Sequence, residues 1–348
     1  MAKQSRTTIA DVARRAGVSK GSVSFALNDR PGVAPDTRAR ILEAAKDFGW
    51  TPSIRARSLS VGKSFACGLV IGRSPDVIAA DPFFHSLIAG IEDEFSTAGQ
   101  VLVLAVATPG RHESHTYRGL AADKRVDGVI LTDLRAGDDR IGLVHELGLA
   151  AVTLGVADVE SPYSSVSVDD CAGVRLAVQH LAKLGHRRIA HVAGPDAMLH
   201  SSRRKDAFAR AAADAGITAQ SVTTDFSARE GALATEALLS GELRPTAIVF
   251  SNDHMAVAGL GVAGRLGLRV PDDLSIVGFD DTELGRYLHP ALTSVATDAR
   301  EWGALAARTL LSAVGGDAPV DIRLAEPTLS VRASTGPAPT ELRGIRRT

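Results

Sequence analysis

The stretch TTIADVARRAGVSKGSVSFALN, residues 7–28, predicts two short helices joined by a tight turn. Its apolar residues Ile9, Val12 and Ala16 recur at helical spacing, and Gly17 is a stop signal for that first helix. Ser19 is a good N-cap for a second helix that runs to about Leu27. Two helices joined by a turn that contains glycine form a helix-turn-helix.

The residues that follow complete a small N-terminal head. A third helix is predicted over residues 35–48, because Ile41, Leu42, Ala45 and Phe48 fall on one face. Residues 51–63 (TPSIRARSLSVGK) are polar and carry few apolar side chains. A segment this short is marginal as a free helix in water, so we expect a linker that orders on binding.

The rest of the chain alternates between two patterns. Apolar runs typical of buried strands cover residues 65–71, 101–106, 128–131, 151–154, 188–194, 246–250 and 274–279. Helical patterns lie between them, over residues 85–98, 170–184, 201–215, 228–240, 255–266 and 300–313. This alternation predicts parallel sheets with helices on both faces, and its length favours two α/β subdomains. Residues 336–348 (GPAPTELRGIRRT) are expected to form a flexible tail.

Composition limits the class of protein. The chain has 348 residues, of which 45% are apolar and 23% charged, as in soluble globular proteins. It has no apolar run long enough for a membrane helix, and because residues 1–8 are polar we expect no secretory signal. Its two cysteines, Cys67 and Cys171, are expected as reduced thiols in the cytoplasm. Residues 1–63 carry 12 Lys and Arg against 5 Asp and Glu, whereas the rest carries 27 against 35. A basic head on an acidic body indicates nucleic-acid contact at one end.

Several motifs in order along the chain carry a family resemblance. They are residues 7–28, VAPDTRARILEAAKDFGWTPS (33–53), ARSL (56–59), VDGVIL (126–131), HLAKLGHRRIAHVAGP (180–195), PTAIVFSNDHMA (245–256) and PDDLSIVGFDDTE (271–283). Together they resemble the lactose-repressor/galactose-repressor family of bacterial transcription regulators. The resemblance implies an all-α DNA-binding head (1–50), a hinge helix (51–63) and a body like that of periplasmic sugar-binding proteins. That body would hold two doubly wound parallel-sheet subdomains, roughly 64–167 with 297–327 and 168–296 with 328–335.

The second helix of the head is the expected DNA-reading element, because the start of that helix enters the major groove. Lys20 can donate to the O6 and N7 atoms of guanine. Candidate DNA contacts in the head are Thr8, Ser19, Lys20, Gly21, Ser22, Ser24, Phe25 and Asn28, and in the hinge Arg55, Arg57 and Leu59. Many members of the family carry Arg where Phe25 stands, so Phe25 either touches a thymine methyl or, our preferred alternative, packs on the head's core. Leu59 matches the leucine that the family inserts into the minor groove to kink DNA.

The resemblance also implies a small-molecule site in the body. Arg204, Asn252 and Asp280 match the family's polar ligand contacts, and the last two follow predicted strands, where open α/β sheets bind ligands. Phe226 matches a stacking aromatic residue, and Phe83 or Phe84 forms either the opposite wall or part of the core. Some sugar-binding relatives have an aspartate where this chain has Gly155.

These observations predict a cytoplasmic, homodimeric, sequence-specific transcriptional regulator, most simply a repressor, that binds pseudo-palindromic operator DNA. Its effector would be a small molecule such as a sugar, bound between the subdomains, with no cofactor, metal or catalytic activity. One alternative is a solute-binding receptor without DNA function. The other is an NAD-dependent enzyme, suggested by the glycines of residues 259–264 but disfavoured because they fall in a helical pattern and not directly after a strand.

Overall fold

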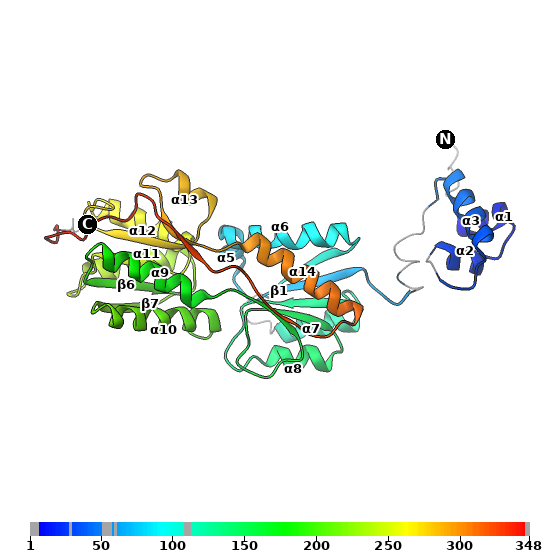
Figure 1. Cartoon of the computed structure of the whole chain (residues 1–348), viewed down its shortest axis with the longest axis horizontal. Helices are drawn as coiled ribbons and strands as arrows, with labels where there is room; N and C mark the ends of the chain where they lie inside the picture. Colours follow the sequence, from blue (N-terminus) through cyan, green and yellow to red (C-terminus); the bar gives the residue numbers. More distant parts are fainter. Residues whose placement is uncertain (1–6, 28–29, 51–57, 59–60, 108–112, 345–348) are drawn as a thin grey trace. The chain divides into compact units, whose positions relative to one another are not determined.

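The computed structural model of the chain describes residues 7–27, 30–50, 58, 61–107 and 113–344. It divides into two compact units, Met1–Phe65 and Ala66–Thr348 (Figure 1). No helix among these described residues combines the length and the apolar character needed to cross a membrane.

The first unit is the predicted helix-turn-helix with a third helix. Its helices are α1 (Ile9–Ala16), α2 (Lys20–Leu27) and α3 (Pro35–Asp47). Gly17 ends α1 in the left-handed conformation (φ 65°), which glycine adopts without the strain of a side chain. Val12, Val23 and Ile41, one from each helix, are fully buried at the centre of the unit.

The second unit contains two six-stranded sheets. The first sheet has the order β11-β5-β4-β3-β1-β2 and the second β12-β10-β9-β8-β6-β7. The strands are β1 (Ala66–Ile71), β2 (Val101–Val106), β3 (Gly128–Leu131), β4 (Ala150–Leu154), β5 (Ser164–Ser167), β6 (Arg188–Ala193), β7 (Thr218–Thr223), β8 (Ala247–Phe250), β9 (Ser275–Asp280), β10 (Thr293–Ala296), β11 (Asp321–Arg323) and β12 (Thr328–Ser330). The helices are α5 (Pro75–Ala80), α6 (Pro82–Thr97), α7 (Glu113–Ala122), α8 (Asp139–Glu146), α9 (Asp170–Lys183), α10 (Leu199–Asp214), α11 (Ala228–Ser240), α12 (Asp253–Arg265), α13 (Glu283–Tyr287) and α14 (Ala299–Gly315).

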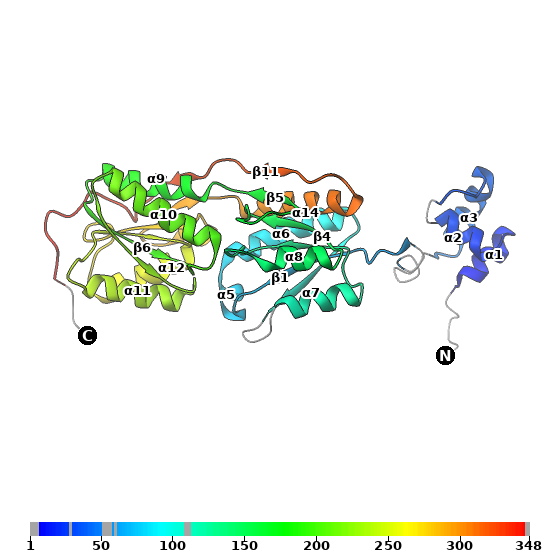
Figure 2. The ribbon, with the colours of Figure 1, turned by 90° about the horizontal axis from the view of Figure 1, so that it is seen from below.

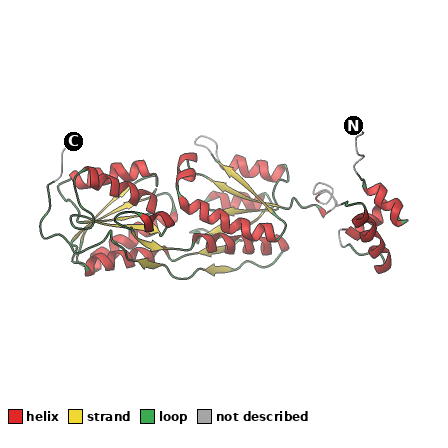
Figure 3. Ribbon diagram, turned by 90° about the horizontal axis from the view of Figure 1, so that it is seen from above, coloured by secondary structure: helices red, strands yellow, loops and turns green. Residues whose placement is uncertain are grey.

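Both faces of each sheet are covered by helices, as the strand–helix alternation predicts (Figure 3). In β6, Ala190 and Val192 pack into one apolar cluster with α11 and α12, whereas Ile189 packs into a second cluster with α9 and α10. Figure 2 shows these two pairs of helices on opposite sides of β6. The first sheet has the same division, with α6 and α14 on one face and α7 and α8 on the other. Strands β1, β3 and β8, buried on both faces, are apolar at every position, which is why their sequences are readable as continuous runs.

The α/β class predicted for the body is confirmed, with one difference in detail. All described strand pairs are parallel except β10 with β12, which is antiparallel. Within the described residues the chain crosses between the sheets three times, after β5, after β10 and between β11 and β12. These crossings leave the carboxyl ends of several strands of both sheets lining one cavity.

The segment expected as a flexible tail is, up to residue 344, described and bonded to the second sheet. The Gly336 carbonyl oxygen lies 3.1 Å from His186 Nε2, and the Ala338 amide donates to the Leu184 carbonyl (2.9 Å). Arg343 forms an ion pair with Asp273 (3.3 Å). The Pro and Gly content of this segment therefore reflects an irregular path along the surface, held by hydrogen bonds, and residues 345–348 lie outside the described part.

Candidate functional site

The second unit holds a cavity of about 250 Å³ lined by both sheets. Arg73 follows β1, Asp133 follows β3, Gly155 follows β4 and Asn252 follows β8, while Asp280 is the last residue of β9. The cavity therefore lies at the carboxyl ends of the strands, where open α/β sheets bind ligands. Other lining residues are Asp81, Phe83, Thr132, Ser167, Asp170, Cys171, His200, Arg203, Arg204, Phe226, Ser251, Trp302 and Arg323.

Arg204, on α10, is fixed to the wall of the cavity. Its Nε and Nη2 donate to Asp170 Oδ1 (3.0 and 2.6 Å), and its Nη1 donates to the Ser251 carbonyl (3.0 Å). The guanidinium carbon lies 3.7 Å from the centre of the Phe279 ring, a cation–π distance. The side chain is therefore pre-organised, and a ligand meets a guanidinium whose plane is already set.

The side chain of Asn252 caps a helix and also bonds to residues that are distant in the sequence. Its Oδ1 accepts a hydrogen bond from the Met255 amide (2.8 Å), which caps the start of α12. Its Nδ2 donates to the Phe226 carbonyl and to Asp81 Oδ2, both at 3.1 Å. Asp81 in turn caps α6 by accepting from the Phe83 amide (3.1 Å).

Asp280, unlike Arg204 and Asn252, has a side chain with no hydrogen-bond partner among the described residues. It lines the cavity. Burial raises its pKa well above the usual value, and the nearby Asp81 raises that pKa further. Its backbone φ of 108° is rare for a residue with a side chain, and such conformations cluster at functional sites. The arrangement leaves a half-buried carboxyl group open to a polar group on a ligand.

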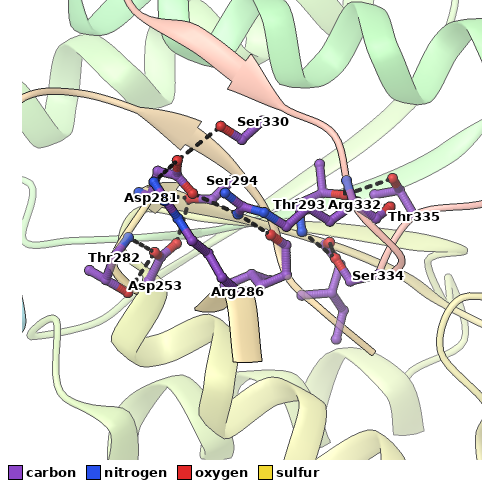
Figure 4. A network of polar contacts seen from close by, with 12 residues as sticks. Asp253, Asp281, Thr282, Arg286, Thr293, Ser294, Ser330, Arg332, Ser334 and Thr335 are labelled. Atoms are coloured by element: carbon purple, nitrogen blue, oxygen red, sulfur yellow. Dashed lines mark hydrogen bonds and ion pairs between the residues drawn. The ribbon is translucent and has the colours of Figure 1, made fainter. Parts of the chain in front are cut away.

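A polar network around Asp281 and Thr282, which follow Asp280 in the chain, holds this strand end in place (Figure 4). Asp253 Oδ2 accepts from the Thr282 amide (2.7 Å), and its Oδ1 accepts from Ser294 Oγ (2.6 Å). Ser294 Oγ also accepts from the Asp281 amide (3.1 Å), and the Asp281 carboxylate pairs with Arg332 (2.6 Å). The neighbours of Asp280 are thus bonded to β10 and to the segment after β12, so its unusual conformation is enforced from outside the cavity.

Two lining residues that the sequence analysis did not select form the closest ion pair of the cavity. Arg73 Nε and Nη2 donate to Asp133 Oδ2 and Oδ1 at 2.7 and 2.5 Å. Burial raises the pKa of Asp133, but the charge and the hydrogen bonds of Arg73, together with the charges of His200 and Arg140, outweigh burial and lower the pKa to about 2. Charged residues placed one or two positions after apolar strands are the signal that would have indicated both.

The aromatic residues divide between the cavity and the core. Phe83 and Phe226 line the cavity, together with Trp302, whose ring lies 6.1 Å from that of Phe83. Phe84 does not line it, because its ring is fully buried in the apolar cluster of the first sheet, so the core alternative is correct for Phe84. Phe226 is only 2% exposed and stacks on His200 at 5.6 Å. Burial and Arg204 lower the pKa of His200 to about 4, so this imidazole is neutral at pH 7.

In the first unit, the predicted DNA-contacting residues lie around the start of α2. Ser19 Oγ accepts from the Ser22 amide (3.0 Å), Lys20 and Gly21 are exposed, and Ser24 is half-buried. At the start of α1, the Thr8 hydroxyl and amide both donate to Asp11 Oδ2 (2.7 and 3.0 Å).

Phe25 is not part of the head's apolar core. Its side chain is 41% exposed, near Gly32, and the Arg30 guanidinium lies 5.9 Å from its ring centre. This position differs from the core packing that we preferred from the sequence, because Val23 and Ala26 supply the buried face of α2. Asn28, Arg55, Arg57 and Leu59 lie outside the described residues.

A helix-turn-helix head joined to a two-sheet body with an internal polar cavity is the architecture of a ligand-responsive DNA-binding regulator. Comparison with known families agrees. Residues 8–53 match the model of bacterial regulatory proteins of the lacI family, and residues 178–335 match that of the periplasmic binding protein-like domain. The chain therefore belongs to the LacI family, and it is a DNA-binding transcriptional regulator.

Individual relatives cover almost the whole chain. The regulator CelR of Thermobifida fusca is 32% identical over 96% of this chain and 100% of its own length, and MalR of Streptomyces coelicolor is 34% identical over 96% and 98%. Among solved structures, a complex of CelR with cellobiose matches with a TM-score of 0.73, 31% identity and coverage of 94% and 100%. The lac repressor dimer bound to operator and the anti-inducer ONPF matches with a TM-score of 0.80, 27% identity and coverage of 95% and 99%.

Proposed function

We propose that this chain is a cytoplasmic repressor whose affinity for operator DNA is controlled by a sugar or related metabolite bound in the 250 Å³ cavity. The observation that carries this proposal is the open carboxylate of Asp280 in a cavity lined by Arg204, Asn252 and aromatic side chains. Acceptors, donors and ring faces in one buried site are what a polyhydroxyl ligand requires. The relatives crystallised with cellobiose and ONPF support the same ligand chemistry. The chain acts by binding, with no cofactor, and not by catalysis.

Effector control follows from the division of the body. We assign the subdomains to residues 64–167 with 297–327 and to 168–296 with 328–335. Arg204, Asn252 and Asp280 belong to the second subdomain, whereas Asp81, Phe83 and Trp302 belong to the first. A ligand that touches both subdomains favours one relative arrangement, and it shifts the equilibrium only by its differential affinity for the two arrangements.

The working form is a homodimer with two heads on a pseudo-palindromic operator, since a two-fold dimer reads a two-fold site. The edge strand β2 supports this assembly, because Val101, Leu104 and Val106 are exposed on it. An apolar sheet edge left open to water is an association site. In each head, Lys20 reads base edges and Ser19 and Ser22 contact phosphates, while Leu59 in the hinge acts as the minor-groove wedge.

The test combines ligand and DNA binding on the purified protein. A thermal-shift screen of sugars and related metabolites identifies the effector, and a gel-shift assay with genomic fragments identifies the operator. Arg204→Ala is expected to abolish the effector's influence on DNA binding and to leave operator affinity without effector unchanged. A variant that still responds normally would exclude this cavity as the effector site.

A further inference from the structure

Arg73 extends from the first sheet toward a ring that belongs to the second. It follows β1, and its side chain is only 9% exposed. The pair of short hydrogen bonds to Asp133 fixes the guanidinium, and both residues stand after neighbouring strands of the same sheet. The side chain is therefore a rigid part of the first sheet's edge of the cavity.

The guanidinium of Arg73 lies over the ring of Phe226, which follows β7 in the second sheet. Cζ of Arg73 lies 4.5 Å from the centre of the Phe226 ring and 5.1 Å from that of Phe84. His200 stacks on Phe226 with the ring planes inclined by 14°, and Gly194 allows the backbone to approach the ring where a Cβ atom would collide. The family resemblance implies that the aromatic residue at this position stacks on the ligand. In this chain, Arg73 and His200 cover the Phe226 ring instead.

We propose that Arg73 is a specificity-determining residue, which covers Phe226 and so limits the effector to a molecule of about one sugar ring. This inference rests on the proposed function of the cavity as an effector site. The space left, about 250 Å³, lies below the range of roughly 300–1,000 Å³ usual for pockets that hold drug-sized ligands. The remaining walls, Phe83, Trp302 and the carboxylate of Asp280, are still open to a single ring.

Displacing the Arg73 side chain to make room for a larger ligand is energetically costly. Moving it would leave the Asp133 carboxylate buried without its cation, and a buried carboxylate without a partner is costly. It would also break the cation–π contact that joins the two sheets. A second sugar ring stacked on Phe226 would have to replace both interactions.

Isothermal titration calorimetry of the full-length protein tests the inference with matched sugars. The probes are monosaccharides (glucose, galactose, xylose, ribose) and disaccharides (cellobiose, lactose, maltose, sucrose). We expect the best monosaccharide to bind at least about tenfold tighter than the best disaccharide. The double variant Arg73→Ala with Asp133→Ala, which removes both charges together, is expected to reduce this preference at least about tenfold by admitting disaccharides.

The controls separate the inference from the proposed function. The pair Arg300→Ala with Asp93→Ala removes an exposed ion pair of the same type outside the cavity and should leave the preference unchanged. If the first double variant fails to fold, Arg73→Lys should move the preference in the same direction. Lysine keeps a positive charge beside Asp133, but its shorter side chain has no planar guanidinium to cover the Phe226 ring. Wild-type protein that binds a disaccharide best, or a preference unchanged in the variants, would overturn the role of Arg73. A protein that binds none of these sugars would show that the proposed carbohydrate effector is itself wrong, and the inference falls with it.

Discussion

Asn252 Nδ2 donates a hydrogen bond of 3.1 Å to Asp81 Oδ2, and this bond joins the two sheets across the cavity. Each partner also caps a helix in its own half, α12 for Asn252 and α6 for Asp81. A movement that separates the halves therefore breaks a buried hydrogen bond without disturbing either cap. Such a contact differs between two arrangements of the subdomains, which is what a ligand needs in order to favour one of them.

Asp81→Ala is expected to lower the free energy of unfolding by about 2–3 kcal/mol, because it removes the cap of α6 and one acceptor of the buried Asn252 amide. Urea unfolding followed by circular dichroism measures the change. Ser227→Ala is the matched control, since Ser227 caps α11 through the Glu230 amide and lies outside the cavity. Its expected cost is about 1 kcal/mol. Equal losses in the two variants would contradict a contribution from the bond between the sheets.

A second prediction concerns Arg140, which is buried below the loop that carries Asp133. Its side chain is 3% exposed, and it donates to Asp138 (2.9 and 2.6 Å) and to the carbonyls of Thr132 and Asp133 (both 3.0 Å). Arg140→Met should cost about 3–5 kcal/mol of unfolding free energy, because it leaves the buried Asp138 carboxylate uncompensated.

Arg300→Met provides the comparison for Arg140. Arg300 is 66% exposed, and its ion pair with Asp93 is in contact with water, so the expected cost is no more than about 1 kcal/mol. Denaturant unfolding of both variants under one set of conditions measures the difference. An Arg140 variant as stable as the Arg300 variant would show that the buried ion pair contributes nothing.

The sequence predicts the strands whose residues are apolar and misses those whose residues are mainly polar. The runs over β1, β3 and β8 are apolar at every position, so composition alone indicates them. By contrast, β7 (TAQSVT) is an edge strand with exposed polar positions, and β5 (SSVS) is buried yet polar. Hydrogen bonds of Ser164 and Ser165 to the segment of β11 satisfy those hydroxyls, and that pairing spans 156 residues.

The sequence predicts the site residues that lie in recognisable motifs, but not the pairings between distant parts of the chain. Arg204, Asn252 and Asp280 stand in motifs that carry the family resemblance, and the structure brings all three to one cavity. The pairing of Arg73 with Asp133, 60 residues apart, depends on the order of strands in the sheet, which no local pattern encodes. The burial of Phe84 beside the accessible Phe83 likewise follows from which face of α6 meets the sheet.

Stability should depend on pH through Asp253. Burial raises its pKa from 3.8 to about 6 in the folded protein. Because the raised pKa favours the protonated form on folding, its contribution is full below about pH 3.8 and is lost as the pH rises through 6. A shift of this size corresponds to about 3 kcal/mol. Asp253→Asn removes this titration, so the stability of wild type relative to the variant should fall between pH 4 and 7.

Urea unfolding of both proteins at pH 4, 5, 6 and 7 measures that difference. Asp133 does not interfere, since its pKa, lowered by Arg73 to about 2, places its own loss of stability below pH 4. A difference between wild type and Asp253→Asn that stays constant over the whole range would contradict a raised pKa at this position.

Lys20 tests the role of the head. It is exposed at the start of α2, the position from which a recognition helix reaches base edges. Lys20→Ala should weaken binding to the specific operator by about 1–3 kcal/mol and leave affinity for random DNA nearly unchanged if the ammonium reads guanine. Lys46→Ala is the matched control, because it removes the same exposed charge from the last turn of α3. Fluorescence anisotropy at several salt concentrations separates a base contact of Lys20 from a phosphate contact. An equal loss of affinity for operator and for random DNA, with a shallower salt dependence, would assign Lys20 to a phosphate.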